Sequence, residues 1–183
     1  MKRFRTAFFG FRMLTPVLLL FLFTLTGWTT TVIKMDLPAL VQESDSVVQG
    51  RVEEVYARWD VQLKTIFTYA SVRVDDPLKG EPHQSVLIRQ LGGKVGAMNM
   101  SIAGMPRFVR GEEVIVFLKS NPEGTYHVVG LGQGKYEIVN DFAAMNVSGV
   151  GLADRKTGKV VVDTIMSKEP LETFKSQIRR LAR

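Results

Sequence analysis

Residues 45–56 read DSVVQGRVEEVY, and their side chains alternate between two faces as they do along a half-buried β-strand. Val48 and Val52 fall on one face together with Gly50, whereas the residues between them are polar. The alternation slips at residues 53–54, which predicts a β-bulge, and Gly50 suits a tight bend. The stretch therefore predicts a bent strand that opens a β-rich domain.

Further segments downstream have the properties of strands. Residues 66–74 alternate strictly between two faces, and the turn-forming run DDPLKG at 75–80 follows them. Residues 114–118 (VIVFL) are all apolar, which is typical of a central strand buried on both faces. The complete set of expected strands is 45–56, 66–74, 85–91, 112–118, 126–129 and 135–139, with a hairpin turn at 130–134.

Two helices, a loop and a hairpin complete the expected elements. Asp36 can cap a short helix over residues 36–44, and residues 170–181 form an amphipathic helix with one apolar stripe. Residues 92–106 (GGKVGAMNMSIAGMP) have no sustained period, which indicates a long loop. Residues 147–163 predict a hairpin that turns at Gly158.

The order of these elements favours a mainly β fold. We expect a five- to six-stranded barrel over residues 36–139, opened by the short N-terminal helix. Residues 140–183 then form a C-terminal hairpin and helix that pack on the barrel.

Three segments resemble the netrin-like module, the oligonucleotide/oligosaccharide-binding (OB) barrel of the tissue inhibitors of metalloproteinases. They are residues 45–55 (DSVVQGRVEEV), 68–80 (TYASVRVDDPLKG) and 111–118 (GEEVIVFL). The resemblance covers about residues 36–139. It implies an OB-like barrel and a protein partner, with an exported protease as the partner class.

The chain departs from that family at its inhibitory group. Those inhibitors bind the protease zinc through an N-terminal cysteine, and this sequence contains no cysteine. No residue role therefore transfers from the family, and fold alone does not fix function.

The first 27 residues have the composition of a membrane-targeting segment. Four basic residues precede an apolar run at 13–25, and small residues follow it. A cleaved signal peptide and an uncleaved signal anchor both fit. Either one places the rest of the chain outside the cytoplasm, in the periplasm or secreted, with membrane contact only through residues 1–27.

Charge and composition argue against several function classes. Residues 1–27 hold four of the 24 basic residues and none of the 18 acidic ones, so the remainder carries 20 against 18. A balance of +2 gives no reason to expect a nucleic-acid partner. The lack of cysteine excludes disulfides and thiolate metal sites.

No combination of residues predicts catalysis, a cofactor or a metal. His83 and His127 are the only histidines and lack metal-ligand spacing. The glycines at 130, 132 and 134 precede a strand rather than a helix, so they do not form a dinucleotide site. We expect a non-enzymatic binding protein without cofactor.

Two surfaces are candidates for binding. Met98, Met100 and Met105 share the 92–106 loop, and methionine makes adaptable contacts, so a protein partner is expected there. Alternatively, Phe67, Tyr69 and Arg73 share the outer face of one strand and form a surface for a small ligand or glycan. The C-terminal helix is expected to cover this second face.

Overall fold

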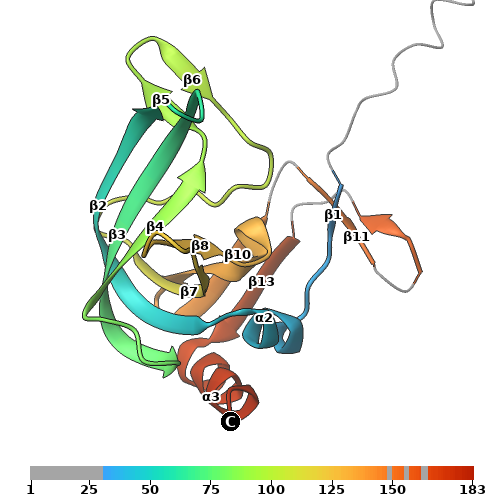
Figure 1. The fold of residues 1–183 in the computed structure, drawn as a ribbon. Helices are drawn as coiled ribbons and strands as arrows, with labels where there is room; N and C mark the ends of the chain where they lie inside the picture. The colour runs from blue at the N-terminus through green and yellow to red at the C-terminus, as the bar shows by residue number, and fades with distance from the viewer. Residues whose placement is uncertain (1–30, 148–149, 155–156, 162–164) are drawn as a thin grey trace, which may run out of the picture.

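The computed structural model describes residues 31–147, 150–154, 157–161 and 165–183 (Figure 1). The predicted leader at 1–27 lies outside the described residues. The described strands are β1 (Thr31–Ile33), β2 (Ser46–Asp60), β3 (Thr65–Lys79), β4 (Ser85–Leu91), β5 (Gly93–Val95), β6 (Met98–Met100), β7 (Glu113–Ser120), β8 (Tyr126–Val128), β9 (Lys135–Val139), β10 (Phe142–Val147), β11 (Gly151–Ala153), β12 (Val160–Val161) and β13 (Ile165–Pro170). The helices are α2 (Leu37–Glu43), α3 (Leu171–Leu181) and the short 3₁₀ helix η1 (Leu131–Gly134).

The prediction of a mainly β fold is confirmed, although the main sheet is larger than expected. Eight strands pair in the order β13-β10-β9-β7-β2-β3-β4-β8. The order of pairing turns back on itself because β8 also pairs with β7. Five strands therefore form a partial ring, in which β4 and β8 run parallel and pair at Ile88 and Tyr126. Two small sheets, β1-β11-β12 and β5-β6, form no strand pairing with it.

The strands β8 and β9 continue each other along one edge of β7. Leu118 pairs with Val128, and Val116 pairs with Lys135. Only Phe117 separates these two positions on β7, so residues 129–134 form a loop between β8 and β9. A side chain at Gly134 would meet the carbonyl oxygen of Val129, so glycine permits the close approach at the base of this loop. The expected hairpin turn at 130–134 is therefore wrong, because the two strands share a neighbour instead of pairing together.

The expected bend in β2 is confirmed. Its pairing with β3 shifts register between Val52 and Glu54, at the slip in the sequence pattern, and at two further places. A Cβ atom at Gly50 would lie 2.1 Å from the carbonyl oxygen of Arg73, so only glycine lets the strands approach there. The pairing with β3 extends as far as Lys79, so residues 75–79, expected as a turn, are strand.

Two apolar cores lie on opposite faces of β7, which confirms its expected burial on both faces. Val114, Val116 and Leu118 point into the partial ring and contact residues of β2, β3 and β4. Ile115 and Phe117 point the other way, into a core that α2 and α3 cover. The central strand thus joins the ring to the helical side of the molecule.

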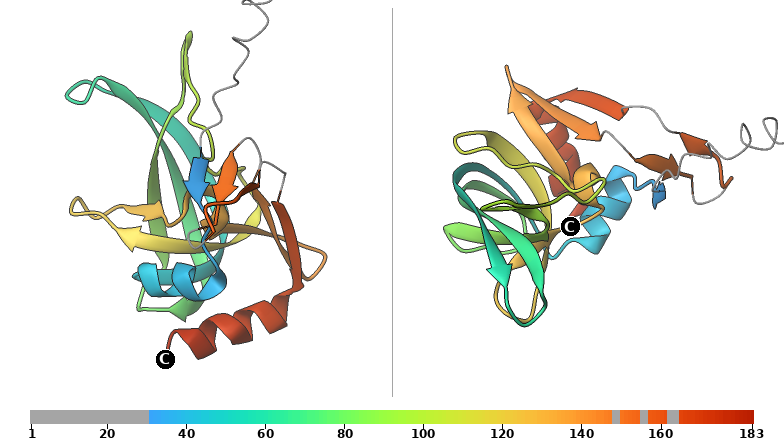
Figure 2. Two further views of the ribbon diagram at one scale, coloured as in Figure 1. Left: turned by 90° about the vertical axis from the view of Figure 1, so that its right-hand side faces the viewer. Right: turned by 90° about the horizontal axis from the view of Figure 1, so that it is seen from above.

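The two described α-helices are close to their predicted bounds. Asp36 accepts a hydrogen bond from the amide of Ala39, which confirms it as the N-cap of α2. The apolar stripe of α3 includes Phe174 and Ile178, which are buried beside α2. Figures 1 and 2 show α3 at one end of the molecule, far from the tips of the β2–β3 and β5–β6 hairpins.

The tail contains more sheet than the sequence indicates. The hairpin expected within 147–163 corresponds to β11 and β12, which pair antiparallel in the described residues. Strands β10 and β13, which the pattern does not predict, add to the edge of the main sheet. The boundary expected at residues 139/140 therefore falls in the turn between two paired strands, because Val139 pairs with Phe142.

Candidate functional site

The outer surface of β2, β3 and β4 holds a cluster of aromatic and guanidinium groups. Its members alternate outward from neighbouring strands, so the pairing register places them side by side. We call this cluster the aromatic face, and it consists of Tyr56, Arg58, Phe67, Tyr69 and Arg89.

Stacking contacts order the aromatic face. The rings of Tyr56 and Tyr69 lie 5.2 Å apart at an interplanar angle of 14°. The guanidinium of Arg58 lies 5.0 Å from the Tyr56 ring centre, and that of Arg89 lies 3.9 Å from the centre of Phe67. The three rings are half-buried, so each keeps part of its surface in contact with solvent. Such contacts contribute about 0.5–1.5 kcal/mol each and fix the rings before any ligand arrives.

The two arginines of the face differ in charge balance. Arg89 forms an ion pair with Glu123. The pKa of the Glu123 carboxyl is lowered by a hydrogen bond from the backbone amide of Glu123 itself and by the charge of Arg89. Among the residues that the structure describes, no carboxylate pairs with Arg58. The face therefore presents one exposed cation whose charge is not neutralised by a neighbour.

The C-terminal helix leaves the aromatic face open, contrary to the expectation that it would cover it. Lys175 and Arg179 of α3 bind the carboxylate of Asp76, at the far end of β3. Phe67 lies nine residues before Asp76, which is about 30 Å along an extended strand. Figure 1 shows the helix at the opposite end of this strand.

The predicted ligand residues fall into two groups. Phe67 and Tyr69 belong to the aromatic face. Arg73 is exposed further along the same side of β3, where its guanidinium pairs with Asp75 at 3.1 Å. Tyr56 and Arg58 are members that the sequence reasoning missed. Their position after the bulge in β2 is the signal that places them outward.

The three predicted methionines have different surroundings. Met98 is 48% exposed at the β5–β6 hairpin, which forms inside the segment expected to be a loop. Met100 is half-buried, and its sulfur lies 3.3 Å from the hydroxyl of Thr65. Met105 lines a cavity of about 250 Å³ beside Lys135 and Glu137. Only Met98 therefore offers a large exposed apolar surface.

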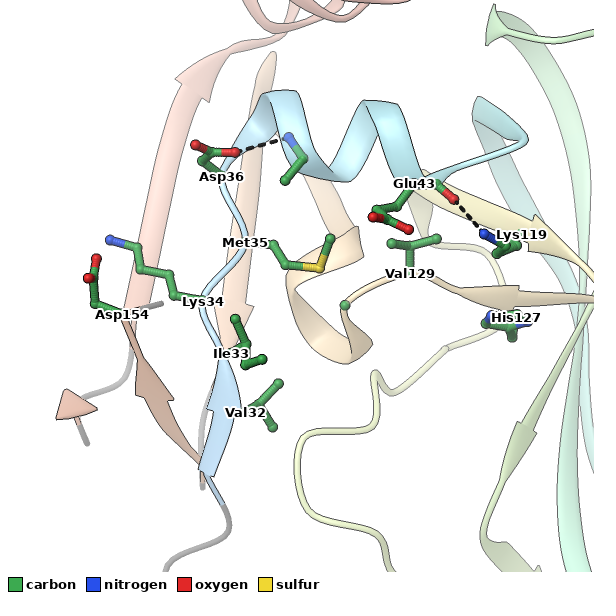
Figure 3. A pocket seen from close by; sticks show the side chains of 12 residues that line it. Val32, Ile33, Lys34, Met35, Asp36, Glu43, Lys119, His127, Val129 and Asp154 are labelled. Atoms are coloured by element: carbon green, nitrogen blue, oxygen red, sulfur yellow. Dashed lines mark hydrogen bonds between the residues drawn. The ribbon is translucent and has the colours of Figure 1, made fainter. Parts of the chain in front are cut away.

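The larger cavity, about 850 Å³, lies between β1, α2 and the end of β8 (Figure 3). Its polar groups bind other parts of the chain. Asp36 caps α2, the Lys119 ammonium lies 3.5 Å from the carbonyl of Glu43, and the His127 ring lies 2.7 Å from the side-chain oxygen of Asn121. These contacts are typical of a cleft between packed elements.

One buried side chain holds the wall of this cavity in place. Gln133, 2% exposed on η1, accepts a hydrogen bond from the amide of Met35 at 2.8 Å. Its amide nitrogen donates to the carbonyl oxygens of Ile33, at 3.0 Å, and Gly130. The side chain thereby takes the place of a neighbouring strand for residues 33–35, a role that no sequence pattern predicts.

A buried lysine fixes the long segment between β4 and β7. Lys135 binds the carboxylates of Glu112 and Glu137 and the carbonyl of Arg107, and its ammonium lies 5.1 Å from the Phe108 ring centre. Each of its donors has a partner, so this cluster stabilises the fold and is not a free charge.

The described ranges contain neither a metal-ligand cluster nor a helix that could span a membrane. No group of three or more histidine, aspartate or glutamate side chains there is arranged to hold a metal ion. Within the same ranges, no helix is long and apolar enough to cross a bilayer. Comparisons with models of protein families and with curated proteins find no match for this chain.

Proposed function

We propose that this chain is an exported, non-catalytic binding module with an OB-like barrel, and that the aromatic face is its principal ligand surface. The order of pairing around the partial ring, β2-β3-β4-β8-β7 and back to β2, supports the OB assignment. So does the parallel pairing of β4 with β8, which are the third and fifth strands of the ring in chain order. Modules of this type bind ligands on the face of their second and third strands, which correspond to β3 and β4 here.

The stacked pair Tyr56–Tyr69 carries the ligand proposal. Sugar rings pack their apolar faces on aromatic side chains, and the pair is ordered before binding. The guanidinium of Arg58, which pairs with no carboxylate of the described residues, adds a donor fork that matches a carboxylate. We therefore propose an oligosaccharide that carries carboxylates, such as one containing uronic acids.

Isothermal titration tests this assignment with a neutral oligosaccharide and a uronic-acid oligosaccharide of equal length. Tyr69→Ala should weaken binding of both by about tenfold, because a base stacked on an aromatic side chain contributes roughly 1–3 kcal/mol and a sugar packed on the same ring makes a comparable contact. Arg58→Ala should weaken only the acidic ligand. Arg180→Ala, an exposed arginine on α3, is the matched control. Equal affinities for the wild type and both face variants contradict the proposal.

A protein partner at the 92–106 segment is the second proposal, and the exposure of Met98 favours it. An exported protease is the class that the netrin-like resemblance implies. Cross-linking from a photoreactive residue at position 98, compared with one at the half-buried Met100, tests this proposal. Equal capture at the two positions, or none at position 98, contradicts it.

A further inference from the structure

The turn between β2 and β3 exposes three large apolar side chains. Trp59 is 42% exposed, Val61 77% and Leu63 60%. We call these three residues the apolar tip. Single exposed apolar residues are normal on soluble proteins, but three within five positions at a projecting hairpin form a contact surface.

The fold does not need apolar residues at this turn. The carboxylate of Asp60 accepts a hydrogen bond from the amide of Leu63 at 2.8 Å, which closes the turn through a polar contact. Lys64 takes a left-handed conformation with φ 50° and completes the reversal. Polar side chains at positions 61 and 63 would therefore fit equally well, so the tip is apolar for a reason outside the fold.

Positive charge lies close to the apolar tip. Lys64 follows Leu63 directly, and Lys94 lies on the β5–β6 hairpin, which packs against β2 and β3. Gly93 lies against Ala57 of β2 and Thr68 of β3, because a side chain built there would meet both. The next residue along the chain is Lys94. The turn also holds one carboxylate, Asp60, which accepts the amide of Leu63, and the two lysines outnumber it.

We propose that the apolar tip inserts into the interfacial layer of an anionic lipid bilayer. Tryptophan favours the headgroup level, aliphatic side chains favour the acyl boundary, and nearby lysines are attracted to anionic headgroups. Figures 1 and 2 show the tip at the end of the molecule opposite α3, in the half where β1 begins. The predicted leader precedes β1, so it would bring this half to a membrane.

Tryptophan fluorescence of the full chain tests the insertion. Trp28 and Trp59 are the only tryptophans, so Trp28→Phe leaves Trp59 as the single reporter. This chain is reconstituted through its leader into vesicles of phosphatidylcholine with or without phosphatidylglycerol, some with brominated acyl chains. We expect a blue shift and quenching of Trp59 in the anionic vesicles.

Variants locate the contact. Val61→Asp with Leu63→Asp, and the milder pair Val61→Ser with Leu63→Ser, should remove most of the quenching without changing the thermal transition. Lys64→Glu with Lys94→Glu should reduce quenching at low salt. Val109→Asp changes another exposed valine and is the control, so its Trp59 should be quenched as in the parent chain.

Three outcomes overturn the proposal. If the emission of Trp59 is neither blue-shifted nor quenched in anionic vesicles, the tip does not insert into the bilayer. Quenching that persists in both tip variants places the contact elsewhere. If quenching is equal with and without phosphatidylglycerol, the tip has no preference for anionic lipids. None of these outcomes bears on the oligosaccharide assay, which uses the aromatic face.

Discussion

The two ends of β3 hold their side chains by different kinds of contact. At the Asp76 end, a carboxylate under α3 binds Lys175 and Arg179, which lie about a hundred residues further along the chain. At the Phe67 end, rings and guanidinium groups contact neighbours on strands that the backbone already pairs. The first set of contacts joins distant elements, whereas the second orders a surface. Substitutions should therefore reduce stability at one end and ligand binding at the other.

The largest loss of stability is expected from the core beneath α3. Phe174→Ala should lower the free energy of unfolding by about 3–5 kcal/mol, because it leaves a cavity in a packed core. The ring is 2% exposed and lies 4.4 Å from that of Tyr136. Urea unfolding measures the loss, with the exposed Leu181→Ala as control. A loss below about 1 kcal/mol would show that α3 is not part of the cooperative fold.

A smaller loss of stability is expected from Gln133, in the looped-out segment 129–134 between β8 and β9. Gln133→Leu leaves the amide of Met35 and the carbonyl of Ile33 without partners and should cost about 1–3 kcal/mol. Hydrogen exchange at Met35 should accelerate more than exchange in β7. Gln133→Glu keeps the acceptor for Met35 and should fall between the wild type and Gln133→Leu. Unchanged exchange at Met35 would remove the role assigned to this glutamine.

The ion pairs at the Asp76 end should appear as a dependence of stability on acid. Burial alone would raise the pKa of Asp76, but hydrogen bonds from Lys175 and Arg179 lower it below the usual 3.8. A depressed folded pKa means that the stabilisation is present above about pH 4 and is lost as pH falls through the folded value.

Asp76→Asn should therefore cost about 1 kcal/mol at neutral pH and flatten the acid limb of the stability curve. Denaturant midpoints measured between neutral pH and strong acid provide the comparison. Asp75→Asn, whose partner Arg73 lies on the same strand, is the matched control. Parallel acid limbs for the wild type and Asp76→Asn would contradict the assignment.

A loss of stability that exceeds that of Asp76→Asn by no more than a few tenths of a kcal/mol is expected at the open end of β3. Tyr69→Ala removes one stacked ring and should cost about 0.5–1.5 kcal/mol, near that of an ordinary surface contact. The same variant should lose most of its oligosaccharide affinity. A double-mutant cycle with Tyr56→Ala measures the coupling of the two rings. A stability loss as large as that of Phe174→Ala would make the aromatic face part of the core and end the comparison.

Elements with their own period could be predicted from the sequence. The bulge in β2, the bounds of β4 and the Asp36 cap each follow from a pattern of adjacent residues. The ranges of β8 and β9 were also predicted, but their arrangement was not, because only the pairing register shows that both lie along β7 instead of pairing with each other. Strands β10 and β13 owe their form to pairing across the sheet rather than to local alternation.

The candidate site was predictable in part for the same reason. Phe67 and Tyr69 lie on a strictly alternating strand, so their shared face follows from spacing alone. Tyr56 and Arg58 join them only after the bulge reverses the phase of β2. Packing decides where α3 lies, and the apolar stripe of the helix does not specify which side of the sheet receives it.

The single glutamine that holds residues 33–35 has a mechanical consequence. Tension applied at Thr31 would load the short pairing of β1 with β11 and the amide group of Gln133 before it reaches α2 along the backbone. These few bonds would break long before the extended ladder between β2 and β3. The N-terminal segment thus acts as a weak link in series, which would detach under load and leave the ring of strands intact.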